Sequence, residues 1–550
     1  MIFQDVMALN ERKPILLLPS TDRHPENEID TIPLLALSHV CKYWRDISIG
    51  TLALWTRVHG RHLGQMDTFL ERSQPLPVTL FLDGEHQGGE WNGPLPEHMA
   101  AVVKAESLRL RRLDLTMLPT RDHVVPLLSS LHAPQLECLT IMTPSPGDSS
   151  LELVSWTPLL DDQASSLRAL GLLPVVDWLP SSTFPRLTHL VLYFGPETME
   201  LVHPFDLLQL LSNAPALEFL HVDLLVYDEP DGGTWQPPSE PISLPHLRSL
   251  LFTDCPYKLL SVVLPRLSLP KDVFIRLQEI IDRALTEGTV DPLPPLPIRS
   301  VTSLDVVMQG EQLLMVADGP TSGLWFAAEL DLYYLGEPQS WGDWLLSLHE
   351  CLTLTHVTHL HIYVDGWETF WPGFLAHLPQ LTHLSALFGK SSGERDLVTG
   401  RCGCPTTVLC DALDQGTPMP CPALDTVMIE WPREIMHQDF VSLPQILDML
   451  EARSEAGHPI RRVVVQVPAT PSFDPAQRLN FFELNELIGT GCPPGTEYEV
   501  IEKAGARRAL CAFEMREVWK VNGEDRYWEV EEREKPHYNL SQLLDDDMDY

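Results

Sequence analysis

A short pattern of apolar residues recurs along most of the chain and limits the folds open to it. The pattern is Leu-x-x-Leu-x-Leu, with Ile, Val or Phe often in the last place. Because alternate residues of a strand share one face, each copy indicates a short strand with one buried side. Clear copies begin at Leu110, Leu136, Leu167, Leu187, Leu217 and Leu247, and weaker copies begin at Val301, Val357, Leu381, Leu424 and Ile460.

Each copy is preceded by features that predict a helix and a turn. Proline cannot occupy a helix interior, so it ends a helix and favours an extended segment after it. Apolar stretches upstream, such as 124–131, 205–211 and 445–453, supply the helices. Many copies have a proline two residues before the first apolar position, namely Pro134, Pro185, Pro215, Pro245, Pro379 and Pro422.

A unit of this size cannot bury its apolar face alone, so we expect the units to stack. The first six copies are spaced by 20 to 31 residues, which brackets the period of leucine-rich repeats. The sequence therefore predicts an α/β fold, an irregular leucine-rich-repeat solenoid over 101–512, with a parallel sheet on the concave side and helices outside. Two later gaps of 54 and 56 residues each leave room for a missed unit. The alternative is an irregular α/β domain in a leucine-rich sequence.

Residues 1–60 read as a helical module, followed by a connector over 61–100. Leu54 and Trp55 form a second apolar cluster after a helix stop at Gly50. On the residues alone, the module is a small helical subdomain that buries its own core. Apolar residues at helical spacing predict one face of a single helix: Leu34, Leu37, Val40, Cys41, Trp44 and Ile47.

The same residues resemble the second half of an F-box, as found in large families of mushroom-forming fungi. Those families show Leu-x-x-Val-Cys-x-x-Trp-Arg-x-Ile followed by Leu-Trp, and this chain matches at 37–47 and 54–55. The stretch 69–82 is also typical of them, and they commonly carry degenerate leucine-rich repeats after the F-box. The opening Leu-Pro-x-Glu segment is not found, so we expect a truncated first motif, with a loop at 11–30.

The resemblance implies an adaptor that catalyses nothing itself. The F-box would bind the Skp-type adaptor of a cullin ubiquitin ligase, and the repeats would hold an unknown target protein. It assigns adaptor binding to Leu37, Val40, Cys41, Trp44, Leu54 and Trp55. An alternative is a repeat scaffold without ligase coupling.

Composition narrows the partners and the compartment. The chain has 38 Lys and Arg against 76 Asp and Glu, a net charge of −38 that repels phosphate backbones. We therefore expect no nucleic-acid partner, and without a long apolar stretch we expect no membrane. Ten scattered cysteines favour a reducing interior, cytoplasm or nucleus. The acidic tail, 513–550, is expected to be at least partly disordered.

Catalytic and metal-binding motifs are weak. Four cysteines lie within twenty residues, Cys402, Cys404, Cys410 and Cys421, but they lack paired Cys-x-x-Cys spacing. We expect free thiols, no cofactor, no metal and no enzyme activity. A metal-dependent enzyme built on these cysteines is the alternative from another class.

Outward strand positions give the candidate target-binding surface. Residues between and after the last two apolar positions point away from the core, and several are aromatic or histidine. Such side chains make good binding anchors, and histidines would give binding a pH dependence near 6.5. The simpler reading is that His and Tyr tolerate half-exposed strands. The candidates are His189, Tyr193, His221, Asp223, His359, His361, Tyr363 and His383.

Overall fold

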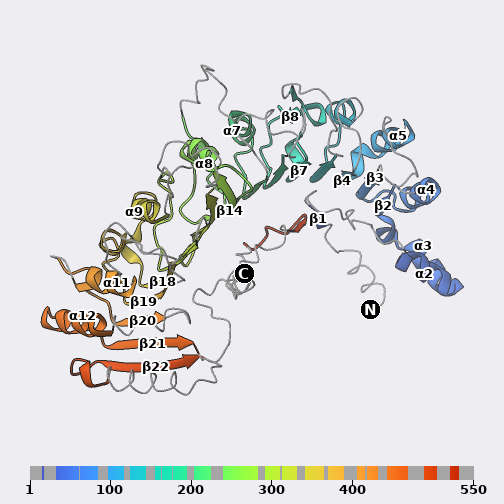
Figure 1. Cartoon of the computed structure of the whole chain (residues 1–550). Helices are drawn as coiled ribbons and strands as arrows, with labels where there is room; N and C mark the ends of the chain where they lie inside the picture. Colours follow the sequence, from blue (N-terminus) through green and yellow to red (C-terminus); the bar gives the residue numbers. More distant parts are fainter. Residues whose placement is uncertain are drawn as a thin grey trace, which may run out of the picture. The chain divides into compact units, whose positions relative to one another are not determined.

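The computed structural model divides the chain into two compact units, each described here by itself. The first is Met1–Pro270 with Lys520–His537, and the second is Lys271–Trp519 with Tyr538–Tyr550. The structure describes residues 15–17, 32–60, 62–83, 97–116, 124–143, 155–162, 164–175, 178–194, 204–223, 240–282, 292–309, 312–330, 341–364, 370–388, 405–414, 418–430, 443–468, 489–503 and 521–531. Both units are mixed α/β and are built on mostly parallel strands (Figure 1).

The first unit contains a parallel ladder in which each strand pairs with the next one of the ladder. Its strands are β2 (Arg57–His59), β3 (Val78–Asp83), β4 (Leu110–Thr116), β5 (Cys138–Met142), β7 (Ala169–Leu173), β9 (His189–Tyr193), β10 (Phe219–Asp223) and β12 (Ser249–Thr253). Helices cover one face of this ladder: α4 (Leu63–Arg72), α5 (Glu97–Glu106), α6 (Val125–Ser129), α7 (Pro204–Ser212) and α8 (Tyr257–Val263) (Figure 1). Small flanking pairs are β6 (Ser155–Thr157) with β8 (Trp178–Pro180), and β11 (Ile242–Ser243) with β13 (Leu267–Ser268).

The apolar positions of the sequence pattern form the core between ladder and helices. In the copy of the pattern that contains β10, Leu217, Leu220 and Val222 are 0%, 2% and 0% exposed. The turn before each strand also repeats, because the amide of Phe219 donates to the carbonyl of Thr188 just as the amide of His189 donates to that of Arg168. All eleven strands predicted from the pattern are present in the structure.

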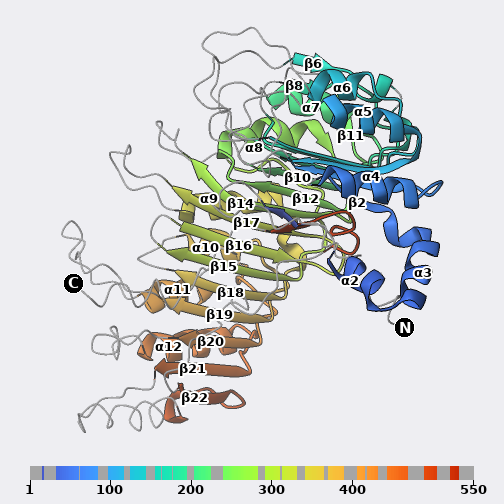
Figure 2. The same ribbon diagram turned by 90° about the vertical axis from the view of Figure 1, so that its right-hand side faces the viewer.

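The second unit departs from a simple succession of strands. Its ladder runs β14 (Phe274–Asp282), β17 (Gly323–Leu330), β16 (Gln312–Asp318), β15 (Ser303–Gln309), β18 (His359–Val364), β19 (His383–Phe388), β20 (Thr426–Glu430), β21 (Arg462–Pro468) and β22 (Glu497–Lys503) (Figure 2). Strand β16 is antiparallel to both neighbours, and the other pairings are parallel. Helices α9 (Trp341–Cys351), α10 (Trp371–Leu375), α11 (Pro405–Asp414) and α12 (Leu443–Glu455) complete the unit.

The two long gaps therefore do not both hold a degraded copy of the unit. The first contains β14 and the second contains β16 and β17. β17 is parallel to β14, whereas β16 is antiparallel to both of its neighbours, unlike the strands that follow the sequence pattern in the first unit. Residues 313–317 of β16 are buried at every position. These residues form a continuous apolar run, which lacks the Leu-x-x-Leu-x-Leu spacing that predicted the other strands.

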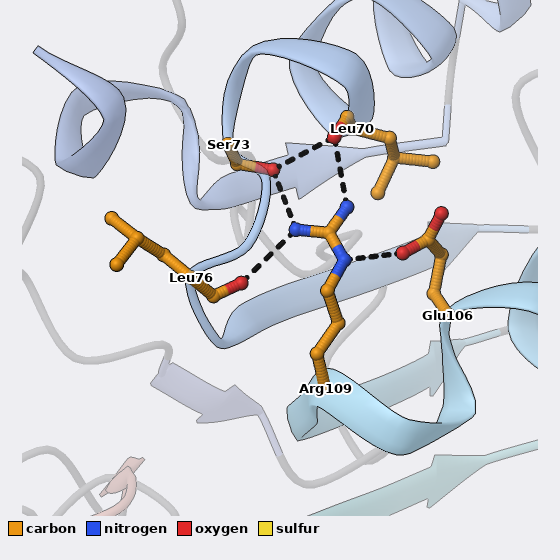
Figure 3. A network of polar contacts seen from close by, with 5 residues as sticks. All are labelled: Leu70, Ser73, Leu76, Glu106 and Arg109. Carbon is orange, nitrogen blue, oxygen red and sulfur yellow. Dashed lines mark hydrogen bonds and ion pairs between the residues drawn. The ribbon is translucent and has the colours of Figure 1, made fainter.

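The expected connector over 61–100 carries α4 and β3, so it forms part of the ladder and its helical layer. Arg109, after α5, fixes this region from inside (Figure 3). Its guanidinium donates to the carbonyls of Leu70 (2.8 Å) and Leu76 (3.0 Å) and to Oγ of Ser73 (2.9 Å), and its Nε pairs with Glu106. One half-buried cation thus ties the end of α4 and the entry to β3 to the end of α5.

The described part of the N-terminal module has two helices where the sequence predicted one, so the expectation of a single helix face is wrong. α2 (Ile32–Val40) and α3 (Lys42–Gly50) are separated at Cys41, whose backbone is extended and whose Sγ accepts from the amide of Trp44. Such a cap starts a new helix and turns its face relative to the first. A 3₁₀ turn, η1 (Leu52–Trp55), follows, and Trp55 is fully buried with its Nε1 donating to the carbonyl of Ser48 (2.8 Å).

Part of the expected acidic tail is ordered. β1 (Ile15–Leu17) pairs in parallel with β23 (Glu529–Glu531), although residues 11–30 were expected to be a loop. The acidic residues 545–549, together with Cys402 and Cys404, lie outside the described residues. Among the helices that the structure describes, none has both the length and the apolar character needed to cross a bilayer.

Candidate functional site

The candidate site lies on the face of the first unit's ladder that the helices leave uncovered. Residues 521–531, which we call the strap, cross this face from β12 to β4. Gly523 and Glu524 lie at the β9–β12 end, and Tyr527 and Trp528 lie at the β4–β7 end. We call the surface of these strands that contacts the strap the strap face.

Two adjacent aromatic residues anchor one end of the strap. Trp528 is 2% exposed, and its Nε1 donates to Oγ1 of Thr140 on β5 (2.9 Å). The carbonyl of Tyr527 accepts a hydrogen bond from Nη1 of Arg112 on β4 (2.8 Å). The two rings close an apolar cluster with Cys138, Met142, Ala169, Leu173, Val191 and Tyr193.

Gly171 on β7 makes room for the indole. A β-carbon at this position would lie 3.5 Å from Cζ2 of Trp528 and 3.5 Å from a methyl of Leu173. A methyl group would therefore make ordinary contacts, but a longer side chain would need the volume that the indole occupies. Because Gly171 has no side chain, the strap face has a slot at this position, and the indole of Trp528 fills it.

Polar contacts fix the other end of the strap. Nε2 of His189 lies 2.8 Å from the carbonyl oxygen of Gly523, and since a carbonyl only accepts, Nε2 carries the proton. Gly523 has φ +98°, a left-handed conformation that favours glycine. Oγ of Ser249 on β12 donates to Oε1 of Glu524 (3.1 Å), whose Oε2 accepts from the amide of Val521 (3.2 Å).

The four candidate residues of the first unit were expected to be exposed, and this expectation is wrong. His189, Tyr193, His221 and Asp223 are 4%, 3%, 8% and 0% exposed. The ring of His189 packs against that of Phe219 in a tilted arrangement, with centroids 4.5 Å apart, and it meets the ring of Tyr527 edge-on, with centroids 4.9 Å apart. Local strand periodicity identified their side of the sheet correctly, but it carries no information about a segment more than 300 residues away.

Burial changes the chemistry of two groups on the strap face. Removal from water lowers the pKa of His189 to about 4, helped by the nearby Arg526, although the bond to Gly523 opposes this. The ring is therefore neutral near pH 6.5, which removes the expected titration at this position. Burial also raises the pKa of the Cys138 thiol to about 12, so it remains protonated at neutral pH.

In the second unit the candidates divide into exposed and buried residues. His359 and His383 are exposed on neighbouring strands, and their rings stack with centroids 4.5 Å apart. Burial and the neighbouring His383 and His361 lower the pKa of His359. Nδ1 of His361 lies 2.7 Å from Oδ1 of Asp305.

Tyr363 is 2% exposed and belongs to a separate apolar cluster. That cluster also contains Val307, Leu314, Val316, Trp325, Ala327 and Leu387. An exposed Tyr363 was expected, and this expectation is wrong, because the second unit has an apolar layer on this side of its strands too.

The predicted adaptor-binding residues also divide by exposure. Leu37, Leu54 and Trp55 are buried, whereas Val40 is 61% exposed, Cys41 is exposed and Trp44 is half-buried. In the described residues seven large apolar side chains are exposed, and five of them lie between 40 and 63: Val40, Tyr43, Ile49, Leu52 and Leu63. An open pocket of about 410 Å³ lies among α2, α3 and α4 and is lined by Leu35, Ile49, Trp55 and Phe69.

The described residues contain no group of three or more His, Cys, Asp or Glu side chains that could hold a metal ion. Cys410 and Cys421 are buried and neither is in a disulfide, and Sγ of Cys421 donates to the carbonyl of Leu375 (3.4 Å). Buried Arg453 on α12 donates to the carbonyls of Leu413, Pro420 and Cys421. These cysteines therefore belong to packed, hydrogen-bonded structure.

Comparison with models of known protein families and with curated proteins found no match for this chain. The residues that sequence reasoning missed are Arg112, Thr140, Tyr527 and Trp528. The one available signal was an adjacent Tyr-Trp pair in a polar, acidic stretch, where large aromatic residues have no local core to join.

Proposed function

We propose that this chain is a substrate-recognition adaptor of a Skp-cullin-F-box ubiquitin ligase. In this proposal the N-terminal module is F-box-like, and the two ladders belong to an irregular leucine-rich-repeat solenoid that binds a target protein. The chain itself would catalyse nothing and would act by bringing the target near the ligase, in the cytoplasm or the nucleus.

The observation that carries the proposal is the concentration of exposed apolar side chains in the module. Val40 and Tyr43 are 61% and 71% exposed, on α2 and α3. Exposed apolar residues that gather in one region mark interaction sites, whereas apolar residues scattered singly over a surface are normal. We therefore assign direct adaptor contact to Val40, Cys41 and Trp44, and a supporting role to the buried Leu37, Leu54 and Trp55.

The test is co-purification with a Skp-type adaptor. The full chain and the adaptor are co-expressed, and the adaptor is measured in the material captured through the chain. Val40→Asp combined with Tyr43→Asp should abolish capture, because charges replace exposed apolar contacts without touching the core. Leu108→Asp is the matched control, since Leu108 is also 61% exposed but lies outside the module.

Capture by the wild type and the Leu108 variant, but not by the double variant, would support the proposal. If the wild type captures no adaptor, the remaining interpretation is a repeat scaffold that is not coupled to a ligase. That alternative shares the strand faces and differs only in the module.

A further inference from the structure

The strap contacts the strap face as a bound peptide contacts a receptor. It does not extend the ladder, since the described pairing of β23 is with β1. It is held by side chains from four strands of the ladder, β4, β5, β9 and β12: Arg112, Thr140, His189 and Ser249. Its two largest side chains, Tyr527 and Trp528, are 8% and 2% exposed.

The strap face is shaped for this chemistry. A slot lined by Gly171 receives the indole, and a hydroxyl at its edge accepts from the indole N–H. Asp114 orients Arg112, because its carboxylate accepts hydrogen bonds from Nε (2.7 Å) and Nη2 (3.1 Å) of the guanidinium. Nη1 then donates to the backbone carbonyl of Tyr527. A central buried aromatic anchor with polar contacts around it is the usual composition of a binding hot spot.

We infer that the strap face is a binding site for an extended peptide carrying an adjacent Tyr-Trp pair, and that the strap occupies this site as an internal stand-in for a target segment. The inference rests on the proposed function in one respect, that a target is captured in trans. A tethered segment competes at high effective concentration, so an external peptide binds only to the fraction of molecules whose strap is released.

The experiment uses the full chain and a fluorescent synthetic peptide of residues 521–531. Binding is measured by fluorescence anisotropy to the wild type and to the double variant Tyr527→Ala with Trp528→Ala. The double variant should bind the peptide at least about 30-fold more tightly, the ratio that corresponds to losing one anchor of ~2 kcal/mol. The same peptide with both aromatic residues changed to Ala should not bind.

Alkylation of Cys138 reports the state of the strap directly. This thiol is 2% exposed beneath the two rings, so it should react faster in the double variant, and added peptide should protect it again. Cys255, which is 1% exposed elsewhere in the same unit, should remain unreactive if the variant is folded. Asn522→Ala is the control within the strap, because Asn522 is exposed.

A second pair of variants tests the strap face itself. Gly171→Leu should expose Cys138 by displacing the indole and should also prevent peptide binding, whereas Gly171→Ala should behave as the wild type. If the double variant exposes Cys255 as well, Trp528→Phe replaces it. That variant retains a ring but lacks the N–H donor to Thr140, and it should gain peptide affinity severalfold.

Equal peptide binding by wild type and strap variants, with Cys255 protected, would overturn the inference. So would failure of the peptide to restore Cys138 protection. These results are independent of adaptor capture, which depends on Val40 and Tyr43. Capture of the adaptor without peptide binding would remove the inference and leave the proposed function intact, and the reverse would remove ligase coupling while retaining the peptide site.

Discussion

Replacing Arg109 should destabilise the first unit more than replacing any exposed cation near it. Its side chain is 13% exposed, so solvent screens its contacts little. Arg109→Ala removes hydrogen bonds to two carbonyls and one hydroxyl and leaves Glu106 without this partner. Losing hydrogen bonds made by a charged group at such a half-buried site costs ~1.5–3 kcal/mol, and we expect a loss of unfolding free energy in that range.

Arg111→Ala is the matched control two residues away. Its side chain is 62% exposed and pairs with Glu137 at 3.0 Å, an arrangement worth less than ~1 kcal/mol. Hydrogen exchange of residues 63–83 and 97–116, followed through a urea titration, would measure both variants. Arg109→Lys should lie between them, because an ammonium group retains the charge but cannot match the planar fork. Equal loss of protection in the two Ala variants would refute the account of Figure 3.

Three further predictions concern pH and buried side chains. His189 is neutral in the folded unit and its pKa is lowered to about 4, so the stability linked to it is complete above pH ~6.5 and falls as the pH drops toward 4. Between pH 7.5 and 5 it should fall by ~2 kcal/mol, a loss absent from His189→Gln in thermal melts. Arg453→Met should lower the urea midpoint of the second unit by the equivalent of ~3 kcal/mol, because three carbonyls lose their buried donor. Trp55→Ala should cost ~3–5 kcal/mol and expose 32–72 to protease, while Trp44→Ala, at a half-buried position, should cost less.

Local pattern predicted the strands because burial on one face follows from residue alternation. Leu110, Leu217 and Leu381 all begin copies that contain a strand, and the prolines mark the turns that precede them. The same alternation also assigned His189 and Tyr193 to the side of the sheet away from the helices. Those features depend on residues that are close together in sequence, so a short stretch of sequence is enough to predict them.

Long-range contacts could not be predicted in this way. The break at Cys41 depends on a weak cap within an otherwise continuous apolar pattern. β16 contains a continuous apolar run that lacks the spacing by which the other strands were predicted. The strap could not be located because nothing near Trp528 in sequence indicates Thr140 or Gly171 as its neighbours. An exposed recognition surface was therefore predicted where the structure has an occupied one.

The strand order of the second unit has a consequence for how the chain acquires its structure during synthesis. In the first unit each strand can pair with one made shortly before it, so the ladder can grow as the chain emerges. Phe274 on β14 pairs with Gly323 on β17, about 50 residues later, and β15 and β16 are made between them. Bringing together strands so far apart in sequence carries an entropic cost that slows the formation of this pairing. Residues 274–330 should therefore form as one cooperative step, and β14 must wait for β17 to leave the ribosome before that pairing can form.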